Sequence, residues 1–135
     1  MAERLCQQLL PTVQVFSRGL YANAAYNVPS KVSSFLSSKG IENVQHHSTQ
    51  LSADDLKNAD LIFCMEKIHL ERLLDRYAQY TDKLYLLYDF AYDKEKDLID
   101  PISLEGRSFI KQAEILCETV TAAVKKIKQQ YGDKL

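Results

Sequence analysis

Residues 61–65 read Leu-Ile-Phe-Cys-Met, a continuous apolar run of strand length. A strand that is apolar at every position is typical of a parallel sheet whose two faces are both covered by helices. The run therefore predicts an α/β fold, with helices on either side of the strand.

Amphipathic patterns before this strand predict the first helices. Residues 2–10 place apolar side chains at helical spacing, and Pro11 ends the pattern. Pro29 suits the first turn of a second helix, and Gly40 is its natural stop. The apolar face of this second helix consists of Val32, Phe35 and Leu36.

Three further helices are expected before and after the strand at 61–65. Ser52 followed by Asp55 resembles a capping box and predicts a short helix through Lys57. Residues 68–77 form another amphipathic pattern. The longest pattern covers residues 108–131, has Gly132 at its end, and carries one apolar stripe: Phe109, Ala113, Leu116, Val120, Val124 and Ile127.

Two more segments have the character of strands. Residues 12–16 read Thr-Val-Gln-Val-Phe and alternate in polarity, and residues 84–87 form a second apolar run, which leads into a charged loop. Helices and strands alternate along the chain, which predicts one domain over residues 1–135 with a parallel sheet and right-handed crossovers. The first helix has no strand to cross over from, so we expect a strand to precede Met1.

Composition excludes several classes of function. The chain has 135 residues, 46% of them apolar, and 17 Lys plus Arg balance 18 Asp plus Glu. With a formal charge of -1, we expect neither a nucleic-acid nor a membrane partner. The chain has no apolar run long enough to cross a membrane and no signal-peptide pattern. Its three cysteines suit reduced, buried thiols. We therefore expect a cytoplasmic protein. His46 and His47 are adjacent and would point apart in an extended segment, so we expect no metal site and no cofactor.

Several short strings, taken in order, resemble the low-molecular-weight protein tyrosine phosphatase family, particularly its bacterial branch, which includes protein-arginine phosphatases. The resemblance implies a three-layer α/β domain with strand order 2-1-3-4, in which the first, central strand is missing here. That strand would lie between the segments at 12–16 and 61–65, and we expect its loss to disturb the remaining sheet. The strings that carry the resemblance are residues 1–3, 12–19, 47–51, 59–65 and 100–101.

The defining motif of that family is Cys-x5-Arg followed by Ser-Pro, and its place would be immediately before Met1. The positions six residues after Cys6, Cys64 and Cys117 hold Thr12, Leu70 and Ala123, so no cysteine of this chain supplies the motif. The chain also has no glycine-rich phosphate loop of another type. We therefore expect an N-terminally truncated, inactive domain, and favour a fragment of a longer protein over closure of the sheet or filling of the gap by a second chain.

The resemblance assigns one catalytic role to this chain. Asp100, which precedes Pro101, would be the general acid that protonates the leaving oxygen and later activates water. Without the resemblance, the same pair reads as an Asp-Pro turn. The family usually has an aromatic residue after this pair, whereas Ile102 stands here. Tyr21 is a candidate substrate-binding residue at the pocket lip.

The resemblance implies hydrolysis of protein phosphotyrosine, or phosphoarginine, through a cysteinyl-phosphate in the full-length form, with a phosphorylated protein as partner. The alternative is a non-catalytic protein-interaction module that uses open sheet edges for a partner or for self-association. A third reading is a related enzyme such as an arsenate reductase, which works through additional thiols. Turnover of an aryl phosphate would discriminate between the first two.

Overall fold

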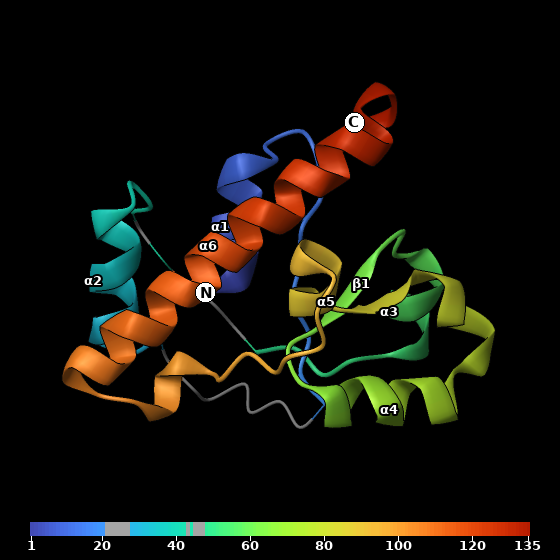
Figure 1. Ribbon diagram of the computed structural model, residues 1–135, viewed down its shortest axis with the longest axis horizontal. Helices are drawn as coiled ribbons and strands as arrows, with labels where there is room; N and C mark the ends of the chain where they lie inside the picture. The colour runs from blue at the N-terminus through green and yellow to red at the C-terminus, as the bar shows by residue number, and fades with distance from the viewer. Residues whose placement is uncertain (21–27, 43, 45–47) are drawn as a thin grey trace.

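In the computed structural model, helices lie on both sides of a two-stranded parallel sheet (Figure 1). The structure describes residues 1–20, 28–42, 44 and 48–135. The strands are β1 (Ile62–Cys64) and β2 (Leu84–Leu86), and the α-helices are α1 (Ala2–Leu9), α2 (Ser30–Ser38), α3 (Ala53–Asn58), α4 (Lys67–Arg76), α5 (Leu87–Tyr92) and α6 (Gly106–Tyr131). Short 3-10 turns are η1 (Ala78–Lys83), η2 (Pro101–Ser103) and η3 (Gly132–Lys134).

The two faces of the sheet contact two separate groups of apolar side chains. Phe63 and Tyr85, which are register partners, pack against the main core formed by α1, α2, α5 and α6. Cys64 and Leu84 point to the other face and join Leu73 of α4 in a second core. Because neighbouring residues of a strand face opposite sides, this division confirms the three-layer α/β fold.

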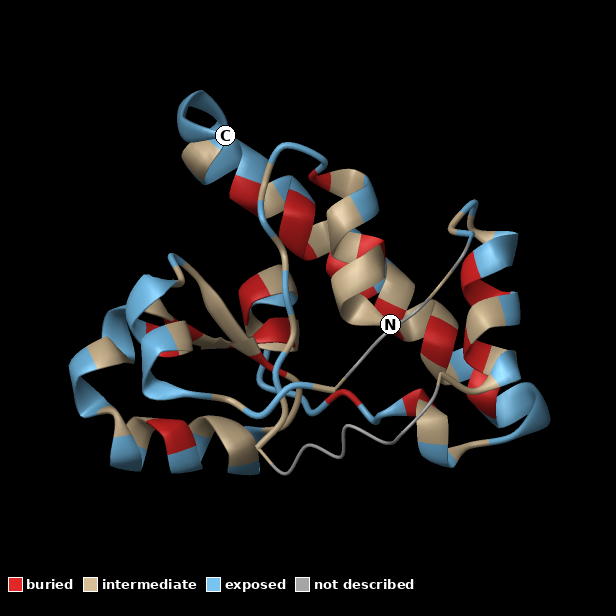
Figure 2. Ribbon diagram, turned by 180° about the vertical axis from the view of Figure 1, so that it is seen from behind, coloured by how far each residue is buried: buried red, intermediate tan, exposed pale blue. Residues whose placement is uncertain are grey.

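Helix α6 is the central element of the main core. All six residues of its predicted apolar stripe are buried, from Phe109 to Ile127. Figure 2 shows buried positions recurring along α6, with exposed residues between them. The prediction for this helix is confirmed, including Gly132 at its end; the φ of Gly132 is -52°, a right-handed value, and the chain continues into η3.

Residues 12–16 do not form the predicted strand, and this part of the prediction was wrong. The segment keeps the burial pattern of a strand, because Val13, Val15 and Ser17 are half-buried while Gln14 and Phe16 are exposed. Among the described residues, however, only the single bridge between Gly19 and Gln50 joins this part of the chain to another extended segment. A strand requires a ladder of backbone partners, which this segment lacks.

Side chains of α1 take the backbone hydrogen bonds that a neighbouring strand would otherwise take. The Gln7 amide donates to the carbonyl of Val13 at 2.7 Å and accepts from the N–H of Val15 at 3.2 Å. One turn earlier in α1, a carboxylate oxygen of Glu3 accepts from the N–H of Ser17 at 2.9 Å. The predicted alternation of residues 12–16 is therefore present, but the hydrogen-bonding partner of this segment is one face of α1 rather than a strand.

The run at residues 84–87 contains a transition that the sequence did not predict. Strand β2 ends at Leu86, and α5 follows where a charged loop was expected. Leu87 and Phe90, three positions apart, are buried in the main core, which favours a helical turn. Lys126 donates to the carbonyl of Phe90 at 3.0 Å. This carbonyl lies in the last turn of α5, where backbone carbonyls have no hydrogen-bond partner within the helix.

The predicted helix ends are mostly confirmed. Ser52 and Asp55 form both hydrogen bonds of the capping box at α3. Gly40 has a φ of +83°, the left-handed conformation that glycine adopts easily, directly after α2. Pro29 is the N-cap of α2 with extended geometry, one position before the helical turn it was assigned to. In the described part of the chain, no helix combines the length and apolar character needed to cross a membrane.

Candidate active site

Asp100 lies in a tight turn that its neighbour Pro101 enforces. Its backbone is extended, with φ of -66° and ψ of 116°, as expected for a residue before proline. The carboxylate oxygen Oδ1 accepts a hydrogen bond from the N–H of Ile102 at 3.0 Å, so Asp100 caps η2. Pro101 is buried while Asp100 is exposed. The carboxylate is thus held in one orientation and remains accessible from solvent.

The first turn of α1 lies close to this carboxylate. Burial lowers the pKa of the Met1 amino group, while the negative charges of Asp100 and Glu3 act in the opposite direction. Of these two acids, Asp100 has the larger influence. The start of α1, which is the positive end of its helix dipole, therefore lies near enough to Asp100 for the two charges to influence each other.

Lys31 of α2 holds the loop that contains Asp100. Its ammonium group donates to the carbonyls of Ile102 at 2.8 Å and Leu104 at 2.7 Å. It also forms an ion pair with Glu105 at 2.7 Å. Lys31 could not be predicted from the sequence, because it lies 71 positions from Ile102 and no local pattern marks it.

Arg18 follows the segment at 12–16 and has a structural role. Its guanidinium pairs with the Asp55 carboxylate at 3.0 Å and stacks over the ring of Phe16 at 4.6 Å. Hydrogen bonding to the backbone of Ser52 lowers the pKa of Asp55, and the charge of Arg18 adds to this effect. These contacts join the loop after α1 to α3, and they occupy the charge that could otherwise bind a phosphate.

The three thiols do not have the environment of a nucleophile. Burial raises the pKa of Cys64 to about 11, and burial also raises the pKa of Cys6 and of Cys117. A nucleophilic cysteine requires the opposite shift, because the thiolate is the reactive form.

Several predicted residues lie outside the part of the chain that the structure describes. These are Tyr21, the candidate for the pocket lip, and the pair His46 and His47. Among the described residues, no group of three or more His, Cys, Asp or Glu side chains could hold a metal ion.

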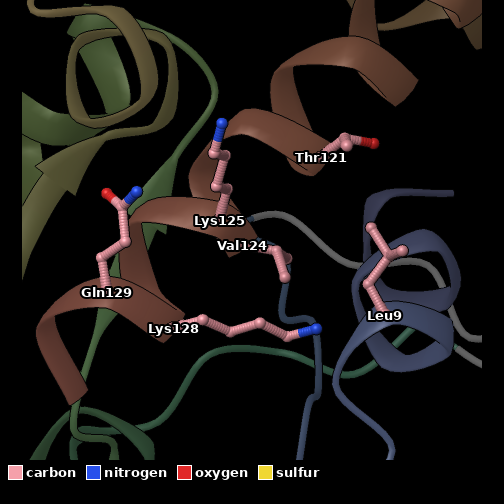
Figure 3. A pocket seen from close by; sticks show the side chains of 6 residues that line it. All are labelled: Leu9, Thr121, Val124, Lys125, Lys128 and Gln129. Atoms are coloured by element: carbon pink, nitrogen blue, oxygen red, sulfur yellow. The ribbon is translucent and has the colours of Figure 1, made fainter. Parts of the chain in front are cut away.

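A shallow depression of about 380 Å³ lies far from Asp100, between α1 and the second half of α6. Figure 3 shows the Lys128 side chain extending from α6 toward α1, which contributes Leu9. Val124 is about 22 Å along the helix from Phe109, which lies at the η2 end of α6. The depression lacks an acid and a thiol, so it is not a site for phosphoryl chemistry. Its lining is Leu9, Thr121, Val124, Lys125, Lys128 and Gln129.

Residues 1–132 match the sequence profile of the family described as low molecular weight phosphotyrosine protein phosphatase. The chain belongs to this family. It is 27% identical over 128 residues to the probable low molecular weight protein-tyrosine-phosphatase EpsP of Ralstonia nicotianae, covering 95% of this chain and 86% of that protein. It is 31% identical over 108 residues to the low molecular weight protein-tyrosine-phosphatase Wzb of Escherichia coli, covering 80% of this chain and 72% of that protein.

Solved structures of this phosphatase family have the same fold. The YwlE arginine phosphatase of Geobacillus stearothermophilus superimposes with a TM-score of 0.87 at 23% identity, over 99% of this chain and 87% of that one. The sheet was expected to be disturbed, and residues 12–16 do lack the ladder of a strand, while the fold as a whole follows this neighbour. Hydrogen bonds from Gln7 and Glu3 hold the segment at 12–16 against α1.

Proposed function

We propose that this phosphatase-family domain serves the hydrolysis of phosphoryl groups on protein tyrosine or arginine, and that residues 1–135 alone do not catalyse it. The observation that supports the proposal is the placement of Asp100, exposed and oriented by η2, beside the first turn of α1. Membership of the family supports the reaction class. The high pKa of Cys64 and the raised pKa of the other two thiols support the absence of turnover.

In the proposed reaction a cysteine thiolate attacks phosphorus, and the bond between phosphorus and the tyrosine oxygen or arginine nitrogen breaks. Asp100 donates its proton to that leaving atom. Water then attacks the cysteinyl-phosphate, its proton passes to the Asp100 carboxylate, and inorganic phosphate leaves with the thiolate regenerated. The thiolate and the arginine that holds the phosphate oxygens must come from a Cys-x5-Arg loop, which residues 1–135 do not contain.

The setting of the reaction is also part of the proposal. The substrate would be a phosphorylated protein, because the relatives are protein phosphatases by name. Cys6, Cys64 and Cys117 are free thiols, which favours a reducing compartment and hence the cytoplasm.

The first test is hydrolysis of an aryl phosphate by the 135-residue chain. We expect no turnover above buffer, since general acid catalysis alone contributes only about 10² to 10⁴ in rate. That is a small part of what the hydrolysis of a phosphate monoester requires. Robust, vanadate-sensitive hydrolysis by this chain would contradict the proposal.

The second test adds an apolar strand and Cys-x5-Arg-Ser-Pro in front of Met1. We expect this extended polypeptide to hydrolyse phosphotyrosine or phosphoarginine peptides, and Asp100→Asn to lower kcat about 10²- to 10⁴-fold. Glu95→Gln, the corresponding change at another exposed acid of the same loop, is the matched control and should leave kcat within a factor of about two. Equal activity of the Asp100→Asn form and its parent would remove Asp100 from the proposed reaction.

A further inference from the structure

The ammonium group of Lys31 is saturated by the loop that follows Asp100. It has three N–H donors, and three acceptors lie within 2.8 Å: the carbonyls of Ile102 and Leu104 and the carboxylate of Glu105. Lys31 is largely covered, with 21% of its side chain exposed, whereas Glu105 is 84% exposed. Solvent screens the ion pair with such an exposed acid, so the two carbonyl contacts are the important ones.

These contacts converge on the residue that orients Asp100. Ile102 donates its N–H to Asp100 Oδ1 at 3.0 Å and gives its carbonyl to Lys31 at 2.8 Å. The Leu104 carbonyl binds Lys31, and the Leu104 N–H closes η2 by donating to Pro101 at 2.9 Å. Lys31 therefore binds the middle of the 3-10 turn and the residue that follows it, while the first N–H of this turn holds the carboxylate.

A second lysine of the same region provides the contrast. Lys39, next to the end of α2, pairs with Glu114 of α6 at 3.1 Å and lies over the Phe35 ring at 5.5 Å. Lys31 likewise pairs with an acid and lies over an aromatic ring, that of Phe109, at 5.5 Å. Both lysines thus bind α2 to α6, but of the two only Lys31 has described contacts to the carbonyls of the Asp100 loop.

We propose that Lys31 is a positioning residue, which sets the orientation of the Asp100 carboxylate through Ile102. The catalytic importance of Lys31 rests on the proposed function, since the orientation of the acid matters only if Asp100 transfers a proton. The effect of Lys31 on the hydrogen bond between Ile102 and Asp100 can be tested on the 135-residue chain without any turnover. Failure of this test is therefore distinct from failure of the proposed reaction.

The experiment follows the amide proton of Ile102 by NMR between pH 3 and 7. An N–H that donates to a carboxylate changes its chemical shift when that carboxylate is protonated, so the Ile102 signal should follow the titration of the Asp100 side-chain carbon. In Lys31→Met we expect the amplitude of this change to fall at least twofold and amide exchange at Ile102 to become at least tenfold faster. Lys31→Arg, which keeps the charge and several donors, should restore both values.

Lys39→Met is the matched control, because it removes an ion pair and an aromatic contact but no contact to the loop. We expect it to lower the melting temperature while the Ile102 titration stays unchanged. If Lys31→Met fails to fold, Lys31→Gln, which keeps one amide donor group, takes its place with the same expected direction. An unchanged Ile102 titration in the folded Lys31 variant, an equal effect of Lys39→Met, or no rescue by arginine would each overturn the proposal.

Discussion

Asp100 owes its orientation to its two neighbours in sequence. Pro101 imposes the extended backbone, and the N–H of Ile102 fixes the carboxylate. This geometry is that of an Asp-Pro turn, and such a turn by itself does not specify a general acid. Asp100 differs from such a turn in the residues that lie near it but far away in sequence. The start of α1 is close enough for its charge to interact with Asp100, and Lys31 binds the neighbouring Ile102.

The thiols allow a prediction at the scale of single residues. Burial raises the pKa of Cys64 to about 11, so its thiolate fraction at pH 8 is about a hundredfold smaller than that of an ordinary cysteine. We expect alkylation by iodoacetamide, followed by mass spectrometry, to modify Cys64 last in the folded protein. Its rate should keep rising with pH up to about 11, because a raised pKa delays loss of the proton.

In urea the three cysteines should react at similar rates, since unfolding removes the burial that distinguishes them. Modification of Cys64 in the folded chain as fast as the half-buried Cys117 would show that the predicted environment is absent.

At the site, the sequence could predict local features and no more. The Asp-Pro turn and the lack of a Cys-x5-Arg loop are both visible within a few neighbouring positions. The contacts of Lys31 with Ile102 and Leu104 span 71 and 73 positions, and a lysine early in a helix has no distinguishing pattern. Such a contact depends on how α2 and η2 are placed by the core.

At the scale of elements, α1 acts as a surrogate partner for the extended segment after it. Glu3 and Gln7 are four positions apart and therefore lie on the same face of the helix. Their side chains bind three backbone groups, those of Val13, Val15 and Ser17. Without these contacts, half-buried backbone groups would lose their partners.

Gln7→Ala tests this role of α1. The Gln7 amide group makes three hydrogen bonds, to the carbonyls of Leu10 and Val13 and from the N–H of Val15. Removing it should lower the free energy of unfolding, measured in urea, by about 1 to 3 kcal/mol, the cost of leaving buried polar groups unpaired.

Gln8→Ala is the matched control in the next position. Gln8 is exposed and makes one hydrogen bond, to the carbonyl of Lys39 at 2.9 Å. Its loss should cost less than about 1 kcal/mol. If both substitutions destabilise the protein equally, α1 does not support the segment in the manner inferred.

The helices that could be predicted have either a long periodic pattern or a short motif formed by residues close together in the sequence. The stripe of α6 spans many turns, and the capping box of α3 depends on Ser52 and Asp55 alone. Residues 12–16 have the polarity of a strand, but pairing depends on a neighbour that sequence does not place. The run at 84–87 conceals the change from β2 to α5, because an apolar run gives no period at which to locate a boundary.

At the scale of the whole molecule, the two cores share the sheet between them. The main core and the second core meet opposite faces of β1 and β2, so neither can be lost without exposing part of the other. We therefore expect one cooperative unfolding transition, in which far-UV circular dichroism and tyrosine fluorescence change together.

Leu116→Ala tests both how much the main core contributes to the free energy of unfolding and whether unfolding is cooperative. Leu116 lies in the middle of α6 and is 2% exposed, so its truncation should cost about 2 to 5 kcal/mol, a large part of the roughly 5 to 15 kcal/mol that stabilises a typical domain. The urea midpoint should fall by the same amount for both spectroscopic probes. Ile110→Ala, on the same helix but 50% exposed, should change the free energy by less than about 0.5 kcal/mol. Separate transitions for the two probes in Leu116→Ala would mean that the cores on the two faces of the sheet unfold independently.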